Sequence, residues 1–358
     1  MSYGQMGLVL GSWQLTYLVF AVLAGMMIDK WGVRNSLFLG AMVIGLSADL
    51  RYFADGFGTF FPIVALFGVG GPLISIGGPK AISQWFRGKN RGLAVGIYMT
   101  GPWIGGMVAL SATNRFIMPL TGYSWRLTFV CYGLFALGVA LLWWFLAREA
   151  SPSGTDESVG IMKVFFGLIK VPNVRIVLLS GLLAFAINHG YTNWLPKILE
   201  AKGMSPSTAG FTASLPLLAG IPAVLALPAL IPNRFRVRGI GLLAFLAGSA
   251  ILVLVNASGV ILLCGLALFG VVGSGMVPLL ILTLMDAPEV GSEYMGSAGG
   301  IFYCISDFGG FMGPLIVGAL VDLTGTFVSG AFFLILLCLV IFAMTFILKH
   351  RPASDPKM

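Results

Sequence analysis

The chain has 358 residues, of which 58% are hydrophobic and 9% are charged, and its mean hydropathy is +0.97. A soluble domain carries about a quarter charged residues, so this composition excludes a soluble globular protein and predicts a polytopic membrane protein. The formal net charge is +8, but the basic residues are scattered over short segments between apolar runs. The positive-inside rule explains that pattern, and we expect no nucleic-acid partner because a continuous basic face is lacking.

Eleven apolar runs follow one another along the chain, and each can cross a hydrocarbon core of about 30 Å as a helix. They cover residues 7–28, 35–54, 59–80, 92–113, 125–147, 173–195, 208–231, 239–256, 259–284, 294–320 and 326–348. These runs predict an all-α membrane protein with eleven transmembrane helices.

A polar, turn-forming segment at 148–172 predicts a linker between two halves of the chain. The expected organisation is an N-terminal bundle at 1–147, this cytoplasmic linker, a C-terminal bundle at 173–349 and a cytoplasmic tail at 350–358.

The loop between the first two runs turns abruptly from apolar residues to charge and glycine, in the order Gly25-Met-Met-Ile-Asp29-Lys30-Trp31-Gly32-Val33-Arg34. The pattern G-x-x-x-D-[RK]-x-G-x-[RK] between two spanning segments resembles the signature loop of the major facilitator superfamily, where it joins the second and third helices on the cytoplasmic side. The resemblance implies two pseudo-symmetric helical bundles around a midplane cavity. It also implies that a small solute crosses by alternating access.

The chain also repeats itself. Residues 92–106 align with residues 296–310 at an offset of 204, and Asp29–Arg34 falls on Asn233–Arg238 at the same offset. Two matches at one offset predict duplicated halves. Subtracting 204 from the run at 173–195 gives positions before residue 1, so the first of the family's twelve helices is expected to be missing. A late sequence start and a natural eleven-helix variant both fit this expectation.

The run at 92–113 carries a glycine and proline pattern that resembles the family's motif in its fifth helix. Small residues let two helices approach closely, and proline lets a helix flex. Tight packing and a hinge both remain open. The residues in question, with their repeat mates, are Gly101, Pro102, Gly105, Gly106, Gly309 and Gly310.

Residues 191–205 are similar to the end of the seventh helix in the cyanate and nitroimidazole permease-like branch, and the loop at 85–92 fits that branch as well. Related nitrate transporters place arginines in helices that correspond to the runs 7–28 and 208–231, yet neither run contains lysine or arginine. An anionic substrate has no visible cationic partner there, unless the missing helix supplies one. The solute therefore stays open among small organic anions, inorganic anions and neutral molecules.

Asp307 stands near the midpoint of the run at 294–320, which contains no lysine or arginine. A charge at that depth costs about 2.5–3.5 kcal/mol, so we predict a carboxyl group that takes up and releases a proton as the cavity opens to either side, or one that binds a cation. A protonated acid bonded to a neighbouring helix is the alternative. The repeat mate of Asp307 is Trp103.

A polar and aromatic cluster surrounds Gly190 in the run at 173–195. His189 and Asn193 are one helical turn apart. His189 can bind the solute or relay a proton, and a purely structural histidine is the alternative. The predicted solute-binding residues are Asn188, His189, Tyr191, Asn193, Trp194, Trp103 and Tyr303.

The segment 286–293 has three acidic residues and no basic residue, against the positive-inside trend. We predict that its acids pair with bases of the first half across the inner mouth and part when the cavity opens inward. Independent solvated charges are the alternative. The residues expected in this gate region are Gly25, Asp29, Lys30, Gly32, Arg34, Arg91, Glu289 and Glu293.

The sequence has no H-E-x-x-H, G-x-S-x-G or Walker motif, and its two histidines are too few for an ordinary metal site. We expect neither enzymatic activity nor a cofactor or metal. The expected partners are a small solute, protons and the lipid bilayer, with the protein as a monomer. An inactive or sensor-like remnant is the alternative function, and a membrane-embedded enzyme is less favoured.

Lysine and arginine also predict the orientation. If the loop at 29–34 is cytoplasmic, sixteen of them fall on the cytoplasmic side and five on the outer side. The positive-inside rule then puts the C-terminus inside and the N-terminus outside. The expected location is the cell membrane, which is the inner membrane in a Gram-negative bacterium.

Overall fold

The computed structural model describes residues 1–86, 88–148, 170–286 and 295–348. These residues form helices and short connections without any β-strand, which confirms the all-α prediction. The chain divides into two compact units, Met1–Asp156 and Glu157–Met358. Most of the linker predicted at 148–172 lies outside the described residues, so the predicted domain boundaries stay a prediction.

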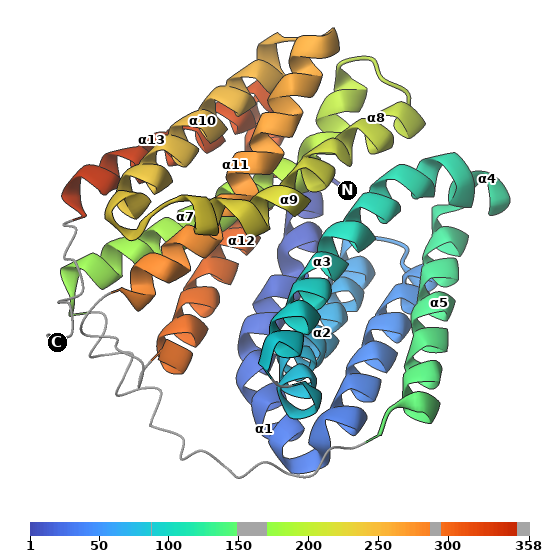
Figure 1. The fold of residues 1–358 in the computed structure, drawn as a ribbon. Helices are drawn as coiled ribbons and strands as arrows, with labels where there is room; N and C mark the ends of the chain where they lie inside the picture. The colour runs from blue at the N-terminus through green and yellow to red at the C-terminus, as the bar shows by residue number, and fades with distance from the viewer. Residues whose placement is uncertain (87, 149–169, 287–294, 349–358) are drawn as a thin grey trace, which may run out of the picture. The chain divides into compact units, whose positions relative to one another are not determined.

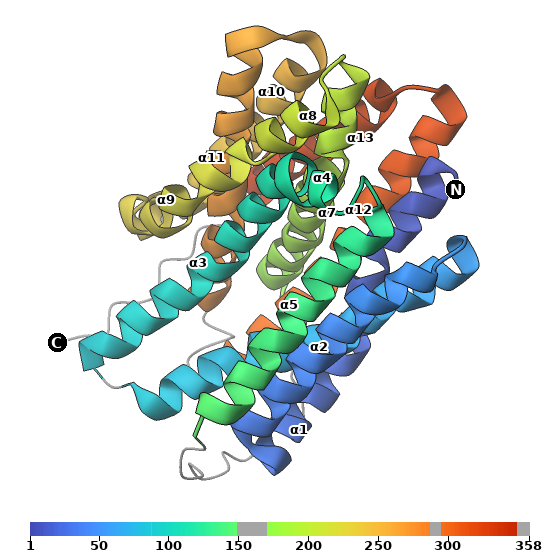
Figure 2. The same ribbon diagram turned by 90° about the vertical axis from the view of Figure 1, so that its right-hand side faces the viewer.

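The first unit contains α1 (Tyr3–Leu50), α2 (Phe57–Trp85), α3 (Gly88–Ala112), the short α4 (Met118–Leu120) and α5 (Trp125–Leu146) (Figures 1 and 2). Two predicted runs, 7–28 and 35–54, both lie in the segment labelled α1, which consists of two helices joined at Gly32. Their connecting loop is a kink at Gly32, where φ is 81° and ψ is 166°. Only glycine adopts such a conformation readily, so the non-helical Gly32 separates two helices and lets the chain turn between the two predicted runs.

Close backbone contact joins α1 to α2. A Cβ added at Gly68 would lie 1.9 Å from the carbonyl oxygen of Trp13, and one at Gly70 would lie 2.6 Å from the carbonyl oxygen of Gly40. Membrane helices are held together largely by such close packing of small residues. Thr16 adds a hydrogen bond of 2.5 Å to the carbonyl oxygen of Ala65. The two helices therefore form the packed core of this unit.

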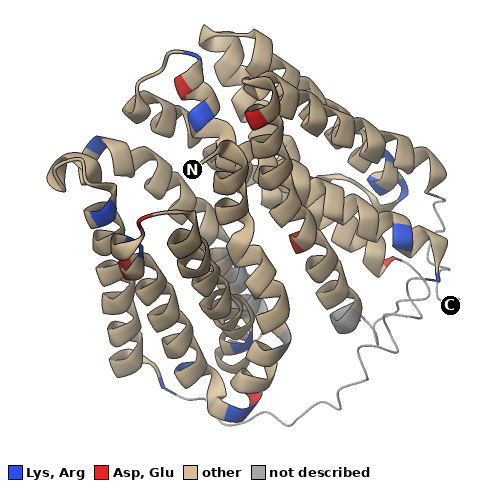
Figure 3. Ribbon diagram, turned by 180° about the vertical axis from the view of Figure 1, so that it is seen from behind, with Lys and Arg blue, Asp and Glu red and all other residues tan. Residues whose placement is uncertain are grey.

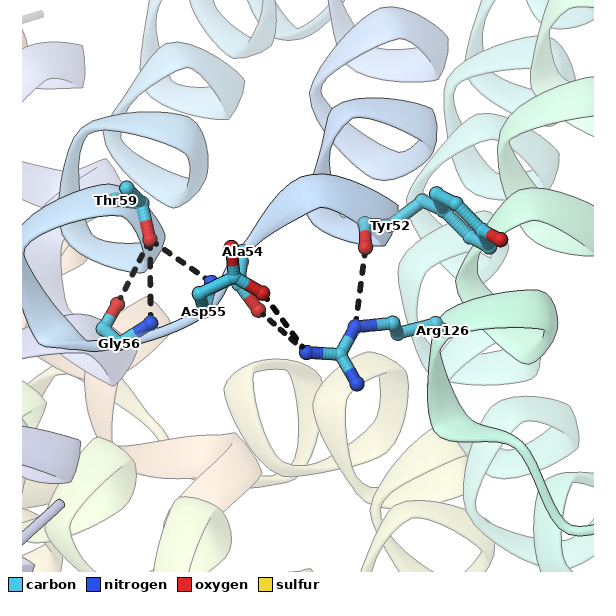
Figure 4. A network of polar contacts seen from close by, with 6 residues as sticks. All are labelled: Tyr52, Ala54, Asp55, Gly56, Thr59 and Arg126. Carbon is cyan, nitrogen blue, oxygen red and sulfur yellow. Dashed lines mark hydrogen bonds and ion pairs between the residues drawn. The ribbon is translucent and has the colours of Figure 1, made fainter.

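Arg126, at the start of α5, ties that helix to the connection between α1 and α2 (Figure 4). Its guanidinium donates to the carbonyl oxygens of Tyr52 and Ala54, each at 3.1 Å, and its Nη2 lies 3.3 Å from the Asp55 carboxylate. Thr59 closes the start of α2, because its hydroxyl accepts from the backbone N–H of Asp55 at 3.1 Å and donates to the Gly56 carbonyl at 3.1 Å. One arginine thus satisfies carbonyl groups that the end of α1 leaves unpaired.

Within the described residues, the α-helices of the second unit are α7 (Pro172–Ala201), α8 (Pro206–Ala213), α9 (Leu215–Leu230), α10 (Arg236–Asn256), α11 (Gly259–Met285), α12 (Met295–Thr324) and α13 (Phe327–Ile347). The predicted run at 208–231 is covered by two of them, because α8 ends before Ser214 and α9 begins after it. Pro216 is the second residue of α9, a position in the first turn of a helix where a missing backbone N–H is tolerated.

Nine helical segments in the described part of the chain are long and apolar enough to cross a membrane. The two other predicted runs, 7–28 and 92–113, are also helical, within α1 and α3. Figure 3 shows that the charged residues lie mainly toward the ends of the helices, as expected for spans surrounded by lipid. All eleven predicted runs are therefore helical over their described residues.

The sequence repeat is also a repeat of helices. Adding the offset of 204 to α2 gives 261–289, which falls on α11, and adding it to α5 gives 329–350, which falls on α13. By the same shift the part of α1 after Gly32 corresponds to α10, and α3 corresponds to α12. The duplicated order of helices follows the prediction.

Candidate functional site

The α7–α12 pair is in backbone contact along one face of each helix. A Cβ added at Gly309 or Gly313 of α12 would lie only 1.9 or 2.2 Å from the carbonyl oxygens of Leu182 and Ala186 on α7. Only glycine fits at such distances, and the G-x-x-x-G spacing keeps both glycines on one face. This contact fixes α7 and α12 against each other as a rigid platform.

Beside this contact, α12 carries Asp307. Its side chain is buried, with 8% of the residue exposed, and it has no hydrogen bond or ion pair with any residue that the structure describes. Its neighbour Ser306 is fully buried, and the Ser306 hydroxyl also lacks a partner among these residues. A buried carboxyl group without a partner is costly, so Asp307 stands out as a site for a proton or a ligand.

Contacts between aromatic rings show that His189 lies on the face of α7 that adjoins Tyr303 of α12. Tyr303, one helical turn before Asp307, lies with its ring 6.2 Å from the ring of Phe185. The Phe185 ring is in turn 5.8 Å from that of His189, one turn further along α7. The faces that carry Tyr303 with Asp307 and Phe185 with His189 therefore adjoin. Sequence reasoning missed Phe185, whose position one turn before His189 was the available signal.

The opposite side of α7 faces α11. The ring of Tyr191 stacks on Phe269 at 3.7 Å and an interplanar angle of 19°, and Tyr191 is fully buried. The Asn188 amide nitrogen lies 3.5 Å from where a Cβ of Gly273 would be. The Tyr191 hydroxyl has no hydrogen-bond partner within the described ranges. Asn188 and Tyr191 thus face a different helix from His189.

Trp194 has a structural environment. Its indole N–H donates to the carbonyl oxygen of Pro314 at 2.9 Å, its ring lies 5.7 Å from that of Phe327, and only 3% of the residue is exposed. Asn193 is half-buried. Trp103 lies on α3 in the first unit and is also half-buried. Of the predicted solute-binding residues, Tyr303 lies one turn from Asp307 on α12, and His189 is linked to Tyr303 through the Phe185 ring.

The signature loop fastens three helices within the first unit. Asp29 forms an ion pair with Lys80 of α2. Arg34 donates to the Trp144 carbonyl of α5 at 2.6 Å and lies 4.5 Å above the Trp144 ring, while the Trp143 indole donates back to the Arg34 carbonyl at 3.1 Å. The loop therefore connects α1 with both α2 and α5.

The predicted gate is only partly visible. Glu289, Glu293 and the Arg91 side chain lie outside what the structure describes. Asp286 pairs with Arg236 inside the second unit. Lys30 is exposed, and no atom lies within 4 Å of a Cβ added at Gly25. Pairing across the inner mouth stays a prediction, and it depends on Glu289 and Glu293 because Arg34 and Asp286 have partners in their own units.

The predicted hinge residues differ between the repeats. Gly101, Pro102 and Gly105 are exposed on α3, and no atom lies within 4 Å of a Cβ added at either glycine. Gly309 is closely packed and Gly310 is buried, whereas Gly106 is half-buried. Proline interrupts the hydrogen-bond ladder in both helices, at Pro102 and Pro314.

Comparison with known proteins decides the family. The family model described as Major Facilitator Superfamily matches residues 1–314. The chain belongs to the major facilitator superfamily. It is a multi-pass membrane protein and a transporter of small solutes, not an enzyme.

Within this superfamily the chain is similar to a hexuronate transporter of Bacillus subtilis, with 26% identity over 93% of this chain and 83% of the relative. It is also 23% identical to a probable sulfoacetate transporter of Cupriavidus necator, over 91% of this chain and 82% of that one. A solved structure of a bacterial homologue of the human lysosomal transporter Spinster, inward-facing and occupied, has a TM-score of 0.75 at 17% identity, and covers 97% of this chain and 89% of its own. The resemblance to the cyanate and nitroimidazole branch stays a prediction.

The superfamily assignment leaves the chemistry of the α7–α12 face to its own side chains. In the part of the chain that the structure describes, no three His, Cys, Asp or Glu residues gather as metal ligands would. The face offers one carboxyl group, one imidazole and one phenol, from Asp307, His189 and Tyr303. These groups can exchange protons and donate hydrogen bonds to a polar solute.

Proposed function

We propose that this transporter moves a small organic anion together with protons by alternating access. The observation that carries the proposal is Asp307, a buried carboxyl group on α12 with no hydrogen-bond or ion-pair partner among the described residues. Two relatives, named for hexuronate and sulfoacetate, support an organic anion as the solute class.

The coupling follows from the charge of Asp307. When it is protonated, the carboxyl group is neutral and can donate a hydrogen bond to a carboxylate or sulfonate. When it is ionised, it repels the anion. At about 6 Å and an effective dielectric constant of about 20, two like charges repel by about 3 kcal/mol, which weakens binding by about a hundredfold. The loaded carrier is therefore the protonated carrier.

The residues beside Asp307 provide no fixed positive charge for an anionic solute. The residues one turn before and after Asp307 on α12 are Tyr303 and Phe311, and the adjoining residues of α7 are Phe185 and His189, so none of these four positions carries lysine or arginine. Neutral donors from Tyr303 and His189, together with the protonated acid, would hold the anion. A proton carried with the solute also offsets the cost of moving its negative charge through the membrane.

Uptake into proteoliposomes tests both parts of the proposal. Glucuronate and sulfoacetate serve as anionic probes, and glucose serves as a neutral probe. An acidic outside medium should drive accumulation of an acid, and uptake should fall as the outside pH is raised. Asp307→Asn, which stays neutral at every pH, should lose pH-driven accumulation by tenfold or more but keep exchange of labelled for unlabelled probe.

The matched control is Asp322→Asn, because Asp322 lies on the same helix but is exposed. It should behave as the wild type does. Unchanged pH-driven accumulation in Asp307→Asn would refute the coupling role. Accumulation of glucose with no transport of either acid would refute the anion assignment.

A further inference from the structure

The turn before α10 and the first turn of that helix together place two arginines beside one aromatic ring. The guanidinium carbons of Arg234 and Arg238 lie 4.7 and 6.0 Å from the centroid of the Phe235 ring. All three residues are exposed, Phe235 by 39%. We call this group the Arg–Phe–Arg patch. We propose that it binds the phosphate of an anionic phospholipid headgroup in the leaflet that surrounds this end of α10.

The third arginine of this segment, Arg236, differs from the other two in having an acidic partner. Arg236 points inward and forms an ion pair with Asp286 at the end of α11. Arg234 and Arg238 have no acidic partner within the described ranges, and the first turn of α10 contains no acidic residue. Two unneutralised cations thus stand at the surface, where a negative ligand can reach both.

The chemistry of the patch fits a lipid phosphate. An arginine guanidinium presents several N–H donors in a planar fork that matches phosphate oxygens. Contact with Phe235 keeps both forks near the same ring and limits the freedom that each would lose on binding. An exposed aromatic ring at the end of a spanning helix is typical of the membrane interface. The ring therefore places the cations at the depth of the headgroups.

The first unit provides an internal comparison, because Asp29–Arg34 is the repeat mate of Asn233–Arg238. There Arg34 turns inward to the Trp144 carbonyl and ring, and Asp29 adds a negative charge to the loop. The equivalent of Arg34 in the second unit is Arg238, which remains outside on Phe235. The patch is therefore a property of the second loop and not of the repeated motif.

Native mass spectrometry of the full chain in detergent can measure the binding. The probes are dioleoyl phosphatidylglycerol, which is anionic, and dioleoyl phosphatidylcholine, which is not. Phosphatidylglycerol should bind more tightly, and Arg234→Gln with Arg238→Gln should weaken its tightest site by about 25-fold, which corresponds to about fivefold for each basic residue near a membrane surface. Phe235→Leu should give a smaller loss, and Arg234→Lys with Arg238→Lys should keep most of the binding.

The control Arg148→Gln with Lys170→Gln removes two exposed cations, neither of which lies over an aromatic ring in the described part of the chain. It should leave the tightest site unchanged, and equal loss in this control would refute a specific patch. Equal binding of the two lipids by the wild type would refute it as well. Inorganic phosphate and glycerol phosphate separate a lipid site from a free-anion site, since displacement of phosphatidylglycerol by either at equal concentration would overturn the lipid assignment.

Discussion

Alanine at Gly309 should destabilise the second unit, whereas alanine at its repeat mate Gly105 should not. A Cβ at Gly309 would lie 1.9 Å from the Leu182 carbonyl oxygen, and ordinary contact begins at 3.4 Å, so α12 must retreat from α7 by about 1.5 Å, the difference between the two values. Both partners are helix backbone, which cannot rotate away as a side chain can. Overpacking of this kind costs about 1–3 kcal/mol.

The Gly105→Ala variant is the matched control, because no atom lies within 4 Å of a Cβ at that position. Alanine should even favour the helix there by up to about 1 kcal/mol. Thermal unfolding of the purified protein, followed by tryptophan fluorescence, measures both variants. Gly309→Ala should lower Tm by several degrees, since about 1 kcal/mol shifts Tm by about 2–4 °C in a domain of 150–250 residues.

Transport provides a second readout of the same pair. The retreat of α12 would move Tyr303 and Asp307 away from Phe185 and His189, so Gly309→Ala should also lose activity per folded molecule. Equal Tm values for Gly309→Ala and the wild type would refute the close approach of the two backbones. A loss in Gly105→Ala as large as that in Gly309→Ala would refute the contrast between the repeats.

Two further predictions concern Trp194 and the gate. Trp194→Phe removes the hydrogen bond to the Pro314 carbonyl, so it should lower the free energy of unfolding by about 1 kcal/mol and leave the KM for the solute unchanged. A large rise in KM with unchanged Tm would instead make Trp194 a solute-binding residue. Glu293→Arg and Arg91→Glu should each slow transport by tenfold or more, and the double variant should recover part of the lost transport rate. If the double variant recovers no transport, the two residues act as independent solvated charges.

The sequence was sufficient for the helices because each apolar run is as long as a bilayer is thick, and the offset of 204 predicted their duplicated order. It was less informative where the backbone departs from a simple helix. The charged loop at 29–34 predicted a break, which the structure narrows to one non-helical residue, Gly32, between the two helices of α1. The run at 208–231 suggested one helix, yet Ser214 separates α8 from α9.

Pairing between distant residues could not be read from local pattern. Arg34 was expected to face acids across the inner mouth, but its guanidinium is held by Trp144, a residue 110 positions away. Asp307 was recognisable as a lone acid inside an apolar run. The register that brings Phe185 against Tyr303 depends on Gly309 and Gly313, whose partners on α7 only the folded backbone reveals.

The two units close the same junction with ion pairs of opposite polarity. In the first unit, the acid Asp29 lies on the loop and pairs with the base Lys80 on α2. In the second unit, the base Arg236 lies next to the loop and pairs with the acid Asp286 at the end of α11. Coulomb attraction is unchanged when the two signs are exchanged, so either arrangement can hold the junction.

The exchange changes the loops themselves. Residues 29–34 carry a formal charge of +1 and residues 233–238 carry +3. Arg236 is neutralised by Asp286, which leaves the charge of Arg234 and Arg238 at the surface around Phe235. Each loop therefore keeps two cations after its ion pair is formed, and the loops differ in where those cations lie, because Arg34 turns inward to Trp144 whereas Arg238 stays exposed beside Phe235.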